Sequence, residues 1–251
     1  MRTIHKLSIF PSLLALSLTP LGIGSAEEHS SQPKTTQSTK VAADVEAKTQ
    51  LATRAAEVLD EIMKTPDQSI PVDLLSRAKC VAVFPATLKA GFVVGAQYGY
   101  GLVSCRQQGA DPWGAPAFFT LTGGSVGFQI GAKATDLILL VMNEEAQREL
   151  LDARVTLGAG LGVSAGPVGR DASAATDVSL QASILSYSRS EGLFAGVDLG
   201  GSVLNYDTET TKEIYGHEWD VKTVLAEPQD TIPALQVFSR TIQKYAPQQL
   251  S

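Results

Sequence analysis

Residues 113–131 read WGAPAFFTLTGGSVGFQIG, and we expect the rest of the chain to be organised around this stretch. Its first half carries Trp113, Phe118 and Phe119, and its second half places glycine at positions 123, 124, 127 and 131. Apolar residues stand between the glycines at the two-residue period of a strand: Val126, Phe128 and Ile130. Glycine weakens a strand unless it permits bending or close backbone approach. The stretch therefore predicts a bent strand at the centre of a sheet.

Other apolar runs predict further strands around this one. Residues 80–84 and 135–142 are continuous apolar segments, as expected of strands buried on both faces. Residues 89–91 are predicted to turn the chain into a strand at 92–95, and residues 99–103 to form the returning strand. This part of the chain is therefore expected to be rich in short, neighbouring strands.

Further along, Asn143 is a good N-cap for a helix that begins with two glutamates. Alternating residues at 178–184 and 193–199 predict a hairpin, with the turn at 188–192. Residues 205–219 are a polar segment that precedes the last predicted helix.

Two helices are expected to flank the sheet. Apolar residues at intervals of three and four predict a helix from about Ala42 to Met63. It packs on the core in one interpretation, and in the other its alanine-rich face contacts a membrane. A C-terminal helix, from about Ile232 to Tyr245, is predicted to close the core. Residues 42–251 are thus expected to form one α+β domain with a curved, mostly antiparallel, glycine-rich and barrel-like sheet.

The first 26 residues have the pattern of an export signal. Arg2 and Lys6 give a positive start, residues 13–23 are apolar, and small residues end at Ala26. Pro20 interrupts the apolar segment, which is shorter than the about 20 residues that a membrane-spanning helix needs. We expect a signal peptide at 1–26, a polar disordered segment at 27–41, and a periplasmic or secreted protein.

Charge limits the partners of the chain. It has 20 basic and 26 acidic residues, a net charge of −6, and loss of the signal would make it more negative still. Nucleic-acid binding needs a basic surface, so this partner is not expected. Simple electrostatic adhesion to anionic membranes is opposed as well. An anionic ligand would therefore have to be bound by a local cluster of cations.

The two cysteines, Cys80 and Cys105, allow two interpretations. In an exported protein a disulfide is favoured, provided that the two residues fall on neighbouring strands. Otherwise they are buried thiols that pack as small apolar groups. Two cysteines without clustered histidines do not make a zinc site, so no metal is expected.

No pattern in the chain supports catalysis. Residues 162–166 match the five-residue nucleophile elbow around Ser164, but only His217 could serve as the base, and the required strand–turn–helix context is missing. A faint dinucleotide-loop pattern at 160–165 lacks its βαβ context. The chain is therefore predicted to be a non-enzymatic protein without a cofactor.

An ordered series of segments carries a family resemblance: residues 70–71, 74–75, 78–85, 89–92, Trp113, Pro116, 123–131, Asn143, 166–170, 186–190 and 192–194. The series resembles the SYLF domain, the Ysc84-type family of lipid- and actin-binding proteins, over roughly residues 45–225. Gly114 departs from the pattern, because the family often has a serine after the tryptophan. The resemblance implies binding of phosphoinositides or membranes, and in fungal relatives of actin, which an exported chain would not meet.

The candidate ligand site consists of cations near the family-like segments. Arg77, Lys79 and Lys89 lie at the edges of the first predicted strand, Arg106 follows the returning strand, and Arg170 follows a glycine-rich turn. Cations that converge on one rim would bind a phosphate through charge-assisted hydrogen bonds. Each could instead be an ordinary surface charge, although Lys89 and Arg170 lie inside family-like segments.

Trp113 beside a polar loop is open to two interpretations, the core or a lipid-contacting surface. The expected function is non-catalytic binding of lipid headgroups or a membrane surface in the cell envelope. The alternative is a structural or protein-interaction module of the envelope, with a protein partner.

Overall fold

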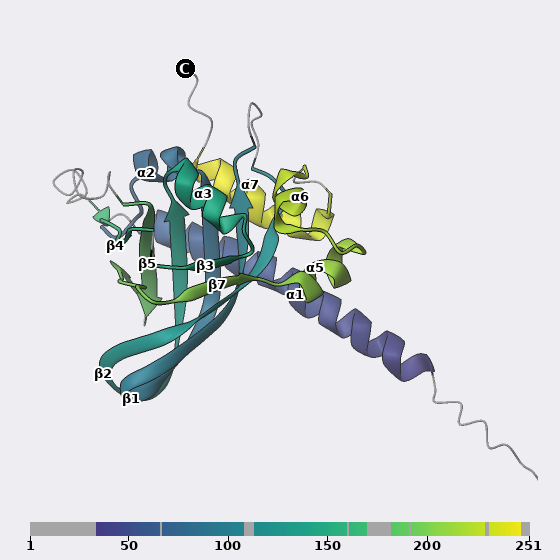
Figure 1. The fold of residues 1–251 in the computed structure, drawn as a ribbon, viewed down its shortest axis with the longest axis horizontal. Helices are drawn as coiled ribbons and strands as arrows, with labels where there is room; N and C mark the ends of the chain where they lie inside the picture. The colour runs from purple at the N-terminus through teal and green to yellow at the C-terminus, as the bar shows by residue number, and fades with distance from the viewer. Residues whose placement is uncertain are drawn as a thin grey trace, which may run out of the picture.

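The computed structural model describes residues 34–65, 67–107, 113–159, 161–169, 182–190, 192–228 and 231–246, with side chains except at 34–44, 92–94 and 125–131. The predicted signal peptide at 1–26 and residues 27–33 lie outside the described part. A curled, mostly antiparallel sheet forms a half-barrel, and the N- and C-terminal helices pack together against it (Figure 1). The predicted α+β class and single domain are confirmed.

The helices are α1 (Lys34–Lys64), α2 (Val72–Arg77), α3 (Glu144–Leu150), α5 (Thr208–Tyr215), α6 (Val221–Ala226), the 3₁₀ helix η2 (Pro233–Leu235) and α7 (Gln236–Tyr245). The strands are β1 (Cys80–Cys105), β2 (Ala117–Val141), β3 (Arg154–Thr156), β4 (Val163–Ala165), β5 (Ile184–Ser190), β6 (Leu193–Gly196) and β7 (Val203–Tyr206). Neighbours in the sheet follow the order β3-β7-β2-β5-β4, with β1 paired to β2 and β6 to β5.

The stretch at 113–131 provides the centre of this sheet, as predicted. From Ala117 it enters β2, which pairs with β1, β5 and β7. The same strand continues through the apolar run at 135–141, so two predicted strands are one. Trp113, Phe118 and Phe119 are fully buried, which assigns Trp113 to the core and removes it from any surface that a lipid could contact.

Strand β1 corrects the prediction for residues 89–103. No turn interrupts it at Lys89–Gly91, because β1 is paired with β2 there and, apart from two register shifts, from Cys80 opposite Val141 to Val103 opposite Ala117. The register shifts between Gly91 and Val93, and there the two-stranded ribbon bends back on itself (Figure 1). A turn was expected because local sequence cannot distinguish a chain reversal from a bend that two paired strands share.

The ends of β1 meet where the ribbon returns to the body of the protein. Cys80 and Cys105 form a disulfide, with their Cα atoms 4.0 Å apart. The backbone N–H of Arg106 donates to the carbonyl of Lys79 at 2.8 Å, so the strand ends are hydrogen-bonded as well. Of the two interpretations of the cysteines, the disulfide is the one the structure contains.

Helix α1 begins at Lys34, eight residues before the expected start at Ala42, and so includes part of the segment predicted to be disordered. The face from Leu51 to Ile62 is buried in the core. Asp60 binds Tyr245 and the Lys244 ammonium, the latter at 2.8 Å, and thereby joins α1 to α7. These contacts hold the pKa of Asp60 well below its usual value, with the hydrogen bond from Lys244 as the main cause. The apolar face of α1 therefore packs on the core, which is the first of the two interpretations of this helix.

Three local predictions have different outcomes. Asn143 caps α3, since its side chain accepts from the Ala146 N–H, and the closing helix is present as η2 and α7. The hairpin is β5 and β6, but residues 188–190 lie in β5 and not in the turn. Residues 178–181 lie outside the described part. The polar segment at 205–219 contains the end of β7 and all of α5.

Within the described residues, no helix is both long and apolar enough to cross a bilayer.

Candidate anion-binding site

Three of the predicted cations come together on one surface. Arg77, Lys79 and Arg106 line a cavity of about 410 Å³, together with Ser76, Met142, Asn143 and Ala182. The remaining candidates do not join them. Lys89 lies far along β1 beside the bend of the ribbon, Trp113 is in the core, and Arg170 is outside the described residues.

The disulfide junction explains why these three cations converge. Arg77 ends α2, and Lys79 follows it directly before β1 begins at Cys80. Arg106 comes 27 residues after Lys79 in the chain, but the disulfide and the bond from its N–H to the Lys79 carbonyl bring it beside Lys79. The cavity therefore depends on the folding back of β1.

Arg106 anchors this region of the structure. Its Nε donates to the carbonyl of Ala78 at 3.2 Å, and its Nη2 donates to the carbonyls of Ser76 and Ala246, each at 3.0 Å. The guanidinium also lies 4.5 Å from the centre of the Trp113 ring, a cation–π contact. Arg106 thus ties the end of α2 to the end of α7, while its charge remains at the wall of the cavity.

Arg77 and Lys79 are paired only loosely. Lys79 Nζ lies 3.7 Å from Glu144, and Arg77 lies 3.7 Å from Asp73. Both distances exceed those of good hydrogen bonds, and exposed ion pairs of this kind contribute about 0–1 kcal/mol. The side chains of Arg77 and Lys79 are 45% and 40% exposed, so they can turn their donors toward an anion.

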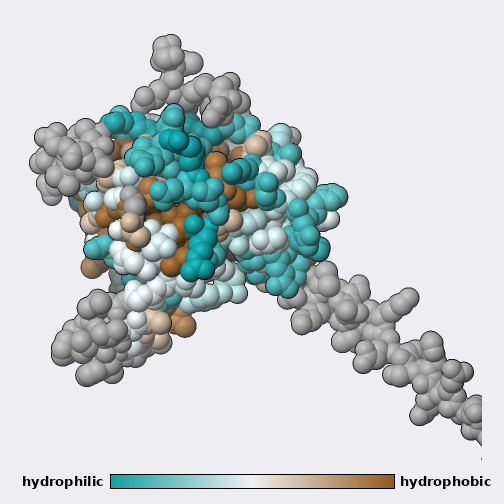
Figure 2. All heavy atoms as spheres, viewed as in Figure 1, coloured by the Kyte–Doolittle hydropathy of each residue, from teal (hydrophilic) through white to brown (hydrophobic). Residues whose placement is uncertain are grey.

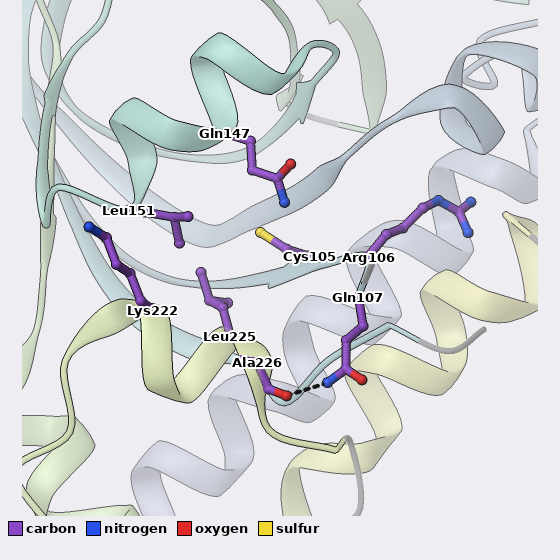
Figure 3. A pocket seen from close by; sticks show the side chains of 8 residues that line it. All are labelled: Cys105, Arg106, Gln107, Gln147, Leu151, Lys222, Leu225 and Ala226. Carbon is purple, nitrogen blue, oxygen red and sulfur yellow. Dashed lines mark hydrogen bonds between the residues drawn. The ribbon is translucent and has the colours of Figure 1, made fainter. Parts of the chain in front are cut away.

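Two further hollows extend the cavity into a groove. One of about 490 Å³ shares Lys79 and Arg106 and adds Gln107, Glu144, Gln147, Arg148 and Leu151. The next, of about 390 Å³, is lined by Cys105, Arg106, Gln107, Gln147, Leu151, Lys222, Leu225 and Ala226 (Figure 3). The three neighbouring hollows share lining residues and follow one another from α2 past α3 to α6, and together they are called the groove below.

The two ends of the groove differ in charge and polarity. Its α2 end carries the cations Arg77, Lys79 and Arg106. At its α6 end, Leu151 and Leu225 approach each other beneath a polar rim, and the Gln107 amide donates to the Ala226 carbonyl at 2.7 Å (Figure 3). Figure 2 shows hydrophobic surface between hydrophilic patches in the region of α3. The arrangement offers positive charge and hydrogen-bond donors to an anion beside a small apolar surface.

The groove also contains three polar residues that the sequence did not predict as part of a site: Gln147, Arg148 and Lys222. The helix that carries Arg148 was expected, but the sequence does not say which of its faces meets Lys79. Lys222 lies in α6, which was not predicted at all.

The structure separates the two residues that a hydrolase would need. Ser164 lies in β4 at one end of the sheet order, where its carbonyl accepts a hydrogen bond from Ser186. His217 follows α5, which comes directly after β7 near the other end of the sheet order, and it stacks on Trp219 with ring centres 5.5 Å apart. Among the described residues there is also no group of three or more metal-binding side chains.

Comparison with known proteins identifies the family of the chain. Residues 122–245 match the family described as Ysc84, Las17-binding protein actin regulator. LAS seventeen-binding protein 3 and protein YSC84 of Saccharomyces cerevisiae are 33% and 34% identical over 201 residues, 77% of this chain and 43% and 42% of theirs. The human SH3 domain-containing YSC84-like protein 1 is 34% identical over 170 residues, 65% of this chain and 49% of its own.

The fold is that of an α+β domain, and the matching family is described as a binding protein and regulator. The chain belongs to the Ysc84 family of SYLF-domain proteins. It spans less than half the length of the three relatives named above.

Proposed function

We propose that the chain binds phosphate-bearing lipid headgroups at a membrane surface, without catalysis, through the groove around Lys79. The observation that carries this proposal is the convergence of Arg77, Lys79 and Arg106 on one cavity. In a chain with a net charge of −6, such a local excess of positive charge is what an anionic ligand requires. Phosphate oxygens would accept charge-assisted hydrogen bonds from Lys79 and Arg77, while Arg106 holds the cavity wall in place.

The test is a calorimetric titration with water-soluble short-chain phosphatidylglycerol, and with phosphatidylcholine of the same chain length for comparison. Changing both Arg77 and Lys79 to glutamate is expected to weaken phosphatidylglycerol binding at least tenfold, because the cavity then repels the phosphate. Arg240→Glu is the matched control, since Arg240 is an exposed residue of α7. Equal affinity of the wild-type and doubly substituted proteins would refute the proposed site.

Export is the second part of the proposal. The N-terminal pattern supports it, and so does the Cys80–Cys105 disulfide, because disulfides persist in oxidising compartments. Export would also separate the chain from actin, which the family description mentions. We expect the mass of the protein isolated from its native cells to correspond to a chain that begins at Glu27. An intact N-terminus in a reducing compartment would contradict export.

A protein-interaction module of the envelope is the second candidate function. The family description supports it, because it names a protein partner. Cross-linking in intact cells distinguishes the two functions. A single protein captured in stoichiometric amount, together with absent lipid binding, would favour the interaction module.

A further inference from the structure

A fourth hollow opens between the end of β7 and the connection from α5 to α6. Its volume is about 510 Å³, within the usual range for ligand pockets. It adjoins the groove, because Leu151 and Lys222 line both. In Figure 3 these two residues lie at the end of the groove away from Arg106. This hollow also contains Trp219 and is called the Trp219 cavity below.

The walls of the Trp219 cavity are apolar and fixed by hydrogen bonds. Leu151, Tyr206 and Trp219 line the cavity and pack against the core. The Tyr206 hydroxyl donates to the Trp219 carbonyl at 2.8 Å, and the Tyr206 N–H donates to the Ala153 carbonyl at 2.8 Å. These bonds join the three chain segments that form the walls. A ligand therefore meets a cavity that is already formed.

Negative charge predominates at the rim of this cavity. Asp152, Glu218 and Asp220 line it, against the single cation Lys222 among its described lining residues. Asp152 lies 3.9 Å from the Lys222 ammonium, too far for a hydrogen bond, and Glu218 pairs with Lys212. The side chains of Asp152 and Glu218 are 71% and 65% exposed. Both carboxylates are therefore accessible to a cation that enters the cavity.

An outer strand edge begins beside the cavity. β3 follows Ala153 directly, ends the sheet order and pairs with β7 (Figure 1). The Ala153 carbonyl and the Leu157 N–H both bond to the β7 side. By the alternation of an antiparallel ladder, the N–H groups of Arg154 and Thr156 point the other way. Both residues are exposed, and such an edge accepts an extended peptide as a further strand.

We propose that the Trp219 cavity binds an arginine or lysine side chain of a basic peptide segment in a partner protein, and that the peptide backbone lies along the outer edge of β3. The aliphatic part of the side chain packs on the apolar walls. Its cationic group binds Asp152 and Glu218 at the rim. Arginine fits best, because its planar guanidinium binds a carboxylate through two parallel hydrogen bonds.

Other occupants fit the cavity less well. Phosphates and acidic peptides are repelled by the three carboxylates. A second copy of the chain is disfavoured by its own net charge of −6. A quaternary ammonium headgroup would match the charge and the apolar walls but would leave the edge of β3 unused. A basic peptide supplies both the cation and the backbone groups.

The inference goes beyond the proposed function and does not depend on lipid binding. The phosphate site consists of Arg77, Lys79 and Arg106 at the α2 end of the groove, and none of them lines the Trp219 cavity. An anionic ligand and a basic peptide can therefore bind at the same time.

The test begins with a bead-bound library of acetylated hexapeptides probed with the labelled wild-type protein. Selected peptides are expected to carry arginine or lysine beside apolar residues. The strongest binder is then titrated by fluorescence anisotropy. Replacing its basic residue with citrulline, the uncharged isostere of arginine, should weaken binding at least tenfold. N-methylation of the adjacent peptide amides should weaken it severalfold, because bonds to β3 are lost.

Asp152→Lys combined with Glu218→Lys is expected to weaken binding of the selected peptide at least tenfold. Glu57→Lys combined with Asp67→Lys is the matched control. It changes the net charge equally, and both residues are exposed and do not line the cavity. The control should bind the peptide within twofold of the wild-type affinity. Urea unfolding checks that both variants are folded.

The cavity also contains its own reporter. The chain has two tryptophans, and Trp113 is fully buried. Peptide binding should therefore change the emission of Trp219. Trp219→Phe should abolish this change while anisotropy still detects binding, because phenylalanine keeps an apolar wall.

The outcomes separate this inference from the proposed function. It would be overturned by a selection without basic residues, by equal affinity for the citrulline peptide, by an equal loss in the control variant, or by unchanged Trp219 emission. Wild-type affinity of the N-methylated peptide would overturn docking on β3. A Trp219 response to dihexanoyl phosphatidylcholine alone would assign the cavity to a lipid headgroup instead. Absent phosphatidylglycerol binding, together with peptide binding that depends on Asp152 and Glu218, would refute the groove and support the cavity.

Discussion

Changing both Cys80 and Cys105 to alanine is expected to lower the free energy of unfolding by about 3 kcal/mol. The disulfide spans a sequence separation of 25 residues, and the chain-entropy estimate for a loop of this size is about 3.5 kcal/mol at 25 °C. The loss should be visible as a lower urea midpoint with little change in the slope of the transition. Both sulfurs belong to buried residues, so the variant also loses some packing.

The wild-type protein measured with and without reductant provides the control for this loss of packing. Reduction should shift the wild-type midpoint toward that of the variant and leave the variant itself unaffected. An unchanged midpoint after complete reduction would show that the disulfide contributes nothing to stability.

Gly101→Ala is expected to destabilise the protein by about 2–3 kcal/mol, the upper part of the range for overpacked cores. A Cβ atom at Gly101 would lie 2.3 Å from Cδ1 of Phe84 and 2.5 Å from the carbonyl oxygen of Val83. Both neighbours belong to the first half of β1, onto which the second half folds. Because one of them is backbone, the clash cannot be relieved by turning a side chain.

Gly124→Ala is the matched control for this substitution. Gly124 also lies in the ribbon, but among the described atoms a Cβ there would have only the Gly95 carbonyl oxygen nearby, at 4.0 Å. Replacing glycine at an open position restricts the unfolded chain, so the change should be neutral or stabilise by about 0.5 kcal/mol. Thermal or urea unfolding of the two variants checks the difference. Equal stabilities would mean that close packing at Gly101 does not determine the fold.

The central strand was predictable from the sequence because its signals are local. Alternating apolar residues and closely spaced glycines in 113–131 are enough to indicate a bent strand. The Asn143 cap and the closing helix were likewise read from short-range patterns. The long-range pairing of Cys80 with Cys105 could only be left open, since it depends on where β1 folds back.

The errors have a common physical cause, which is that tertiary pairing overrides local composition. Residues 188–190 look like a turn, but pairing of Arg189 with Asp136 of β2 extends β5 through them. The bend at Gly91 looks like a turn because the sequence does not show that β2 bends with it. For α5 a local signal did exist, since Asp207 caps its start and Gly216 ends it with a φ of 75°.

Part of the candidate site followed from proximity in sequence and part did not. Arg77 and Lys79 are neighbours along the chain, so their convergence was predictable. Arg106 joins them through the disulfide junction, and Arg148 through the orientation of α3. Lys89 was grouped with the others because it is near them in sequence, but ten residues of strand put it about 33 Å further along β1.

The disulfide between the ends of β1 also has a mechanical consequence. A force that pulls the two termini apart passes from Cys80 to Cys105 through the sulfur atoms and bypasses the 24 residues between them. Those residues would otherwise add roughly 80–90 Å to the stretched chain. The half of the ribbon that carries Lys89 therefore bears no tension when the chain is pulled, and it keeps its bent shape as long as β2 stays beside it.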